Sequence, residues 1–141
     1  MRHGRCSRAA LIVALVLFSA GCGGSELSAG ALSKHADSVR SLASEGALLA
    51  GDASAGKTTH TFTRVHSSEL HKAASQLAST LETAKTRPAL EPKLHRLATL
   101  ARGVSDNLEQ LASASKFEQR TLAGELQRAA DQSNRIAEGL K

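Results

Sequence analysis

Apolar and polar residues alternate along most of this chain with the period of an α-helix. Apolar side chains recur every three or four residues in four stretches, at 27–49, 62–84, 90–112 and 122–140. At about 100° per residue, this spacing places the apolar side chains of each stretch on one face. The pattern predicts four amphipathic helices, and the many alanines and few β-branched residues also favour helix.

Local signals separate the first three predicted helices. A glycine-rich segment, 51–59, lies between the first and the second helix, and Thr58 or Thr59 is the expected N-cap of the second. The third helix follows a short break, and either Pro88 or Pro92 can occupy its first turn, where proline is tolerated.

The fourth helix begins at a recognisable capping signal. Ser115 and Glu118 have the spacing of a capping box, which leaves only a short turn after the third helix. Four helices joined by short turns pack most simply as an up-down-up-down bundle. The sequence therefore predicts an all-α four-helix bundle over residues 27–141.

The first 21 residues have a different character. Three arginines precede a run of twelve residues, 9–20, in which only Ser19 is polar. A helix that spans a bilayer needs about 20 apolar residues, so this run is short for a permanent span. A basic leader, a short apolar run and a small-residue exit are instead typical of a secretory signal peptide.

The end of the apolar run resembles the lipobox of bacterial lipoproteins. The residues that carry the resemblance are Phe18, Ser19, Ala20, Gly21 and Cys22. The family most often has leucine at the position of Ser19, a departure that stays within its range but is expected to lower the efficiency of processing. The alternative is an uncleaved anchor with an incidental cysteine, and the short run and small exit residues argue against it.

The resemblance implies a specific maturation and location. Signal peptidase II would cleave between Gly21 and Cys22, after the sulfur of Cys22 has received diacylglycerol. Residues 1–21 are then the signal peptide, and residues 22–26 are the lipidated cysteine and a flexible tether. The expected location is the extracytoplasmic face of the cell membrane, where two acyl chains anchor a protein stably.

Charge and aromatic content exclude one class of function. Loss of the leader removes three of the 18 Lys and Arg, so the formal charge falls from +5 to +2. The remaining charges are interspersed, and Phe62 and Phe117 are the only aromatic residues after the leader besides histidine. A nucleic-acid-binding surface normally needs a basic face or stacking aromatics, so we expect no nucleic-acid partner.

Residues 51–58, GDASAGKT, match the phosphate-binding P-loop pattern. The motif binds phosphate only where a strand leads into the loop and a helix follows it. Residues 44–50 instead continue a helical apolar pattern and contain no β-branched residue. We therefore expect an inter-helix loop here and no nucleotide.

Histidines raise the question of a cofactor. His35 and His66 fall on apolar faces, but in an antiparallel pair of helices His66 lies level with residue 44. The two imidazoles would then be roughly 13 Å apart along the bundle at 1.5 Å per residue, too far to share a metal. No Gly-x-Ser-x-Gly elbow or other pairing of nucleophile and base is present. We expect no cofactor, no metal site and no enzyme activity.

Basic residues are predicted to gather at the anchored end of the bundle, because the second turn and the C-terminus return to it. They are Lys85, Arg87, Lys93, Arg96 and Lys141. Basic groups near anionic headgroups favour membrane binding, so these residues could contact the lipid surface. The alternative is an ordinary solvated charge cluster.

Phe62 and Phe117 are predicted to lie at the opposite end. We expect them to cover the end of the core, because aromatics are scarce and a core end needs covering. The alternative is a small apolar tip for a partner.

Together these features favour a non-enzymatic, lipid-anchored envelope protein that acts by contact with an unidentified protein partner. The alternative is a carrier or sensor that binds a small ligand, haem or metal between its helices.

Overall fold

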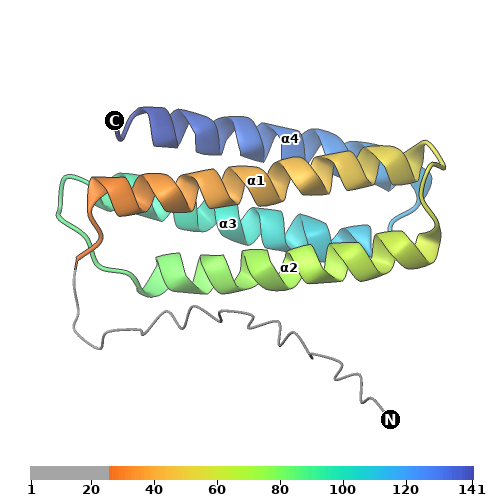
Figure 1. Cartoon of the computed structure of the whole chain (residues 1–141), viewed down its shortest axis with the longest axis horizontal. Helices are drawn as coiled ribbons and strands as arrows, with labels where there is room; N and C mark the ends of the chain where they lie inside the picture. Colours follow the sequence, from red (N-terminus) through yellow and green to blue (C-terminus); the bar gives the residue numbers. More distant parts are fainter. Residues whose placement is uncertain (1–25) are drawn as a thin grey trace, which may run out of the picture.

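The computed structural model describes residues 26–141, which form four helices. They are α1 (Ala29–Ser54), α2 (His60–Thr83), α3 (Glu91–Leu111) and α4 (Lys116–Glu138). Successive helices run in opposite directions along one bundle axis (Figure 1). The predicted all-α four-helix bundle is confirmed.

The helix starts follow the local signals in the sequence. Thr59 is the N-cap of α2, and its side chain accepts a hydrogen bond from the third backbone N–H of the helix. Pro92 lies in the first turn of α3. Ser115 and Glu118 form both hydrogen bonds of the capping box at the start of α4. Each of these signals lies within a few residues, so it acts whatever the tertiary structure.

The predicted break between the first two helices is too long. Residues 51–54 belong to α1, and the chain leaves the helix only at 55–59, where Gly56 has a φ of 72°. A glycine inside a helix costs about 1 kcal/mol relative to alanine. The helix continues through Gly51 because Ala50 and Ala53 on its next turn are buried against the rest of the bundle.

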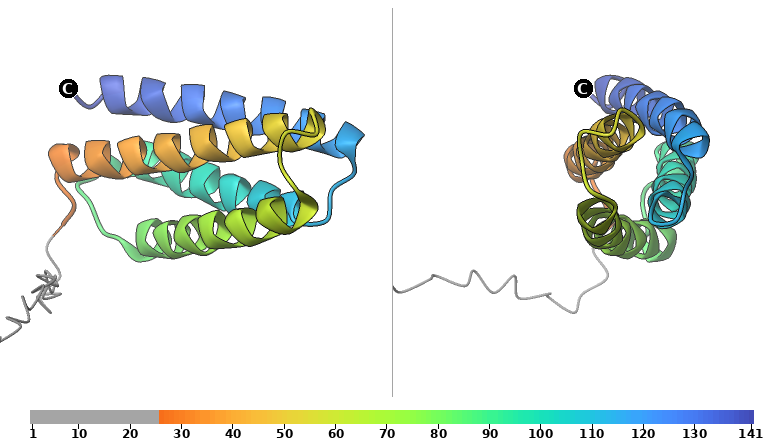
Figure 2. Two further views of the ribbon diagram at one scale, coloured as in Figure 1. Left: turned by 45° about the vertical axis from the view of Figure 1, so that its right-hand side comes forward. Right: turned by 90° about the vertical axis from the view of Figure 1, so that its right-hand side faces the viewer.

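The most extensive helix contact joins α1 to α4, and α2 packs mainly on α3 (Figures 1 and 2). Alanines recur every seven residues on the facing sides of α1 and α4. On α1 they are Ala36, Ala43 and Ala50, and on α4 they are Ala123, Ala130 and Ala137. Small side chains at these positions let two antiparallel helices approach closely along their length.

Leucines from all four helices fill the space that this close pair leaves. The largest fully buried ones are Leu32, Leu81, Leu97, Leu108, Leu111 and Leu126. The buried apolar residues of the described segment, 26–141, form one hydrophobic core, which is what a domain needs to fold alone.

The segment before α1 is tied to the α2–α3 loop. The backbone N–H of Leu27 donates to the carbonyl of Lys85 at 2.7 Å, and the Thr86 hydroxyl donates to the carbonyl of Leu27 at 2.8 Å. The chain therefore enters the bundle at the end where α2 finishes. We call this the Leu27 end, and the opposite end, where α4 starts, the Phe117 end.

Candidate functional site

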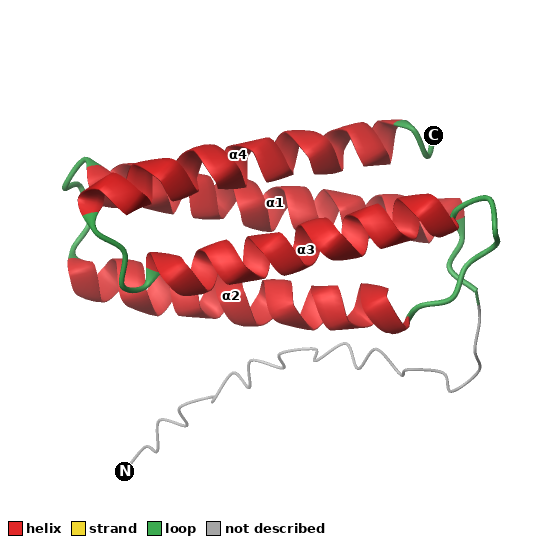
Figure 3. Cartoon of the chain, turned by 180° about the vertical axis from the view of Figure 1, so that it is seen from behind, coloured by secondary structure: helices red, strands yellow, loops and turns green. Residues whose placement is uncertain are grey.

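The described residues offer three surface features: a basic cluster at the Leu27 end, a groove between α3 and α4, and exposed apolar side chains near the Phe117 end. The C-terminus and the α2–α3 loop both lie at the Leu27 end (Figures 1 and 3). The two remaining turns lie at the Phe117 end. The basic cluster therefore lies at one end of the bundle, and the exposed apolar side chains lie near the other.

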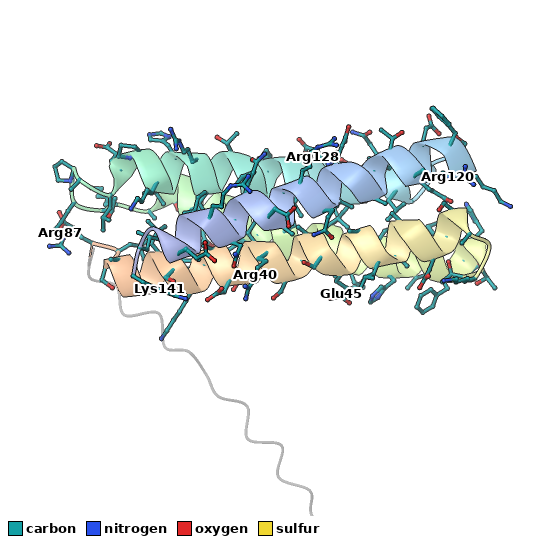
Figure 4. All side chains as sticks on the ribbon, turned by 90° about the horizontal axis from the view of Figure 1, so that it is seen from above. Arg40, Glu45, Arg87, Arg120, Arg128 and Lys141 are labelled. Atoms are coloured by element: carbon teal, nitrogen blue, oxygen red, sulfur yellow. The ribbon has the colours of Figure 1, made fainter. Side chains whose placement is uncertain are left out.

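The structure brings the predicted basic residues to the Leu27 end. They are Lys85 and Arg87 in the α2–α3 loop, Lys93 and Arg96 in the first turns of α3, and the C-terminal Lys141. Figure 4 shows Arg87 and Lys141 at this end. The Lys93 amine donates to the backbone carbonyl of Gly139, so it also ties α3 to the end of α4. A cation is favourable there because helix C-termini carry partial negative charge.

A groove lies between α3 and α4 near the same end, and the sequence analysis did not predict it. Its volume is about 710 Å³. The lining residues are Lys93, His95, Arg96, Thr99, Leu100, Gln132, Arg135 and Ile136. The α4 helix crosses obliquely, so that it lies farther from α3 at the Leu27 end than at the Phe117 end (Figure 4).

The predicted aromatic cover of the core end is wrong. Phe62 is 53% exposed and Phe117 is 78% exposed. Phe62 stacks on His66 along the surface of α2, with ring centroids 5.5 Å apart. Ala53 and Leu111, near the ends of α1 and α3, are buried in this half of the bundle instead.

Two further large apolar side chains are exposed in the same half of the bundle. Leu48 of α1 is 72% exposed, and Val65 of α2 is 55% exposed. The run Ala47-Leu48-Leu49 contained a signal for this, because three consecutive apolar residues cannot all lie on one face of a helix.

The histidines occupy three different environments. His66 Nε2 lies 2.8 Å from a carboxylate oxygen of Glu45, which confirms the predicted level of His66 beside residue 44. His35 is partly buried, and burial lowers its pKa. His71 Nδ1 lies 3.0 Å from the carbonyl oxygen of Ser105 and 3.1 Å from its buried hydroxyl, a pair that the sequence did not suggest.

The Ser105 hydroxyl lies inside a packed helix interface and is 1% exposed, so a substrate has no access to it. Within residues 26–141, no three His, Cys, Asp or Glu side chains lie close enough together to hold a metal ion.

The P-loop-like segment has a different structural context from a phosphate site. Its first four residues end α1, so a helix rather than a strand leads into the loop. Lys57, the lysine of the motif, pairs with Asp52 at 3.2 Å. The expectation that no nucleotide binds here stays a prediction.

The lipobox residues Phe18, Ser19, Ala20, Gly21 and Cys22 lie outside the described residues. Among the helices that are described, none is both long and apolar enough to cross a membrane. Comparisons with protein-family models, with curated proteins and with solved structures found no match to this chain.

Proposed function

We propose that this chain is a non-enzymatic, lipid-anchored protein of a bacterial envelope that binds a protein partner through its Phe117 end. The lipid anchor on Cys22 rests on the resemblance to lipoprotein signal sequences. The Leu27 end faces the membrane in this proposal, because the chain enters the bundle there. The partner would lie at the opposite end, about 39 Å away for a helix of 26 residues at 1.5 Å per residue.

The observation that carries the proposal is the position of the exposed apolar side chains. Leu48, Phe62 and Val65 all lie within one helical turn of the contact between Glu45 and His66. We call these three residues the apolar patch. Apolar side chains gathered on a soluble surface mark interaction sites, and aromatic residues often dominate the binding energy.

The polar rim of the patch fits the same proposal. Glu45 and His66 join α1 to α2 beside it, so the two helices that carry the patch are held in register. A rigid surface loses less conformational entropy when a partner binds than a mobile one does. Phe117 supplies a fourth exposed apolar side chain at the same end.

At the Leu27 end we propose that the basic residues contact anionic lipid. Lys85, Arg87 and Lys141 project from loops and from the chain end, where a planar surface can reach them. Each basic group near an anionic surface contributes about 1 kcal/mol to binding. This contribution adds to the lipid anchor and orients the bundle.

Site-specific photo-crosslinking in bacterial cells tests the partner contact. The full chain carries a photoreactive residue at position 62 or 65, and matched controls carry it at the exposed polar positions Ser41 and Gln76 of the same helices. We expect one discrete cross-linked species from the patch positions alone. Adding Leu48→Ser should weaken that species without lowering the melting temperature.

Equal cross-linking from patch and control positions would overturn the partner contact. So would an unchanged species in the Leu48→Ser chain, because the contact would then not depend on the patch.

A further inference from the structure

The groove between α3 and α4 combines an apolar floor with a cationic rim. Leu100 and Ile136 are partly buried and pack on the core, so they form the floor. Lys93, Arg96 and Arg135 supply three permanent positive charges. No acidic residue lines the groove.

The two arginines are available to a ligand. Among residues 26–141, neither Arg96 nor Arg135 takes part in an ion pair. The acidic residues of α4 nearest to Arg135 in sequence accept hydrogen bonds from amide side chains, Asp131 from Gln127 and Glu138 from Asn134. The lining of the groove therefore carries a net positive charge.

We propose that this groove binds one anionic amphiphile with a single acyl chain, of the fatty carboxylate class. The carboxylate would meet the guanidinium groups of Arg96 and Arg135, which suit planar two-oxygen acceptors. The acyl chain of the ligand would lie on Leu100 and Ile136. Thr99 of α3 and Gln132 of α4 add neutral hydrogen-bonding groups to the lining.

The size and the chemistry of the groove favour this ligand over two others. A groove of about 710 Å³ falls within the range of small-molecule sites, roughly 300–1,000 Å³. A small anion alone would leave the apolar floor uncovered, and a neutral apolar molecule would leave the arginines unused. The inference does not depend on the proposed partner contact, which uses the other end of the bundle.

Calorimetric titration of residues 26–141 with decanoate tests the proposal. Decanol and acetate serve as matched probes that lack the charge and the chain. We expect saturable one-to-one binding of decanoate and at least tenfold weaker binding of either comparator. Lengthening the chain should tighten binding by up to about fourfold for each methylene that the groove covers.

Variants locate the site. Arg96→Gln with Arg135→Gln should weaken decanoate binding by about tenfold or more, because each guanidinium offers charge-assisted hydrogen bonds. The matched control is Arg64→Gln with Arg120→Gln, which removes the same charge from exposed positions in the other half. Leu100→Gln should also weaken binding, whereas Leu77→Gln changes a similarly half-buried leucine outside the groove. Melting temperatures show whether each variant is folded. If Leu100→Gln is unfolded, the comparison of the two arginine pairs is the test.

Several results would overturn the proposal. Equal affinity for decanoate and decanol would mean that the groove does not recognise the charge. Equal affinity for decanoate and acetate would mean that it does not recognise the acyl chain. Equal loss in both arginine pairs would place the effect outside the groove. Binding to phosphatidylglycerol vesicles without binding to decanoate would assign the arginines to a bilayer surface instead.

Discussion

The hydroxyl of Ser133 in α4 donates a 2.8 Å hydrogen bond to the backbone carbonyl of Ala36 in α1. Both residues are fully buried. A side chain as short as serine reaches the backbone of another helix only where the two helices lie very close together. The contact therefore shows that α1 and α4 approach closely, as the seven-residue alanine repeat allows.

Replacing Ser133 tests how strictly this interface limits side-chain volume. Ser133→Ala removes one buried hydrogen bond and should lower the free energy of unfolding by about 1 kcal/mol. Ser133→Leu also has to fit extra carbon atoms between the helices and should cost about 3 kcal/mol or more. Denaturant unfolding of residues 26–141 measures both. A leucine variant as stable as the alanine variant would show that the helices can separate without cost.

Glycine-to-alanine changes should have opposite effects at two helical sites. A Cβ at Gly46 would lie 2.6 Å from a methyl carbon of Leu108 and 3.2 Å from one of Leu126, both buried. Gly46→Ala should lower stability by about 1 kcal/mol, because overpacking outweighs the gain in helix propensity. Nothing lies near a Cβ added at the exposed Gly103. Gly103→Ala should therefore raise stability by about 0.5–1 kcal/mol.

Thermal melting of the two alanine variants beside the parent gives the comparison. The sign difference is the decisive observation, since the chemical change is identical. Stabilisation by Gly46→Ala would mean that Leu108 moves aside without loss of packing.

The sequence predicted what local chemistry decides. The capping box at Ser115 needs only three residues, and the helical faces need only the spacing of apolar side chains. The end of α1 was predicted incorrectly because Ala53 is buried by other helices, an effect that the local glycine signal does not contain. Tertiary packing decided that boundary.

The candidate site was predictable only in part. Topology alone brought Lys85 and Arg87 to the same end as Lys141, since alternate turns of a bundle share an end. The groove depends on the oblique crossing of α4, which periodicity does not encode. The exposure of Phe62 was likewise missed, because an aromatic residue at the edge of an apolar face fits either the core or the surface.

Acid should destabilise the bundle in part through His35. Burial lowers the pKa of His35 in the folded state below its value of about 6.5 in an unfolded chain. Folding therefore favours the neutral imidazole. Its contribution to the free energy of unfolding is complete above the unfolded pKa and is lost as the pH falls through the folded pKa. Unfolding free energies measured between pH 7.5 and 5 should fall less steeply for His35→Gln than for the parent. A slope for His35→Gln equal to that of the parent would contradict a contribution from His35.

Intact mass spectrometry tests the lipid anchor. The full chain expressed in a bacterial host should lose residues 1–21 and gain a diacylglyceryl group on Cys22. Cys22→Ala should abolish the added mass, because no other cysteine remains after the leader. An unprocessed and unmodified mass for both proteins would contradict the lipid anchor and with it the extracytoplasmic location. Binding of labelled nucleotide to the segment 51–58 should then be measured.

Vesicle binding separates a membrane-facing end from an ordinary charged surface. Residues 26–141, which lack the lipid, should bind phosphatidylglycerol vesicles weakly, and binding should fall as salt screens the charges. Lys85→Gln with Arg87→Gln should reduce the affinity by about 30-fold, since each basic residue contributes about 1 kcal/mol near an anionic surface. Arg64→Gln with Arg120→Gln removes the same charge from positions remote from the Leu27 end and should change vesicle binding little. Equal reductions by the two pairs would mean that net charge alone drives the attraction, and the Leu27 end would then have no special relation to the lipid.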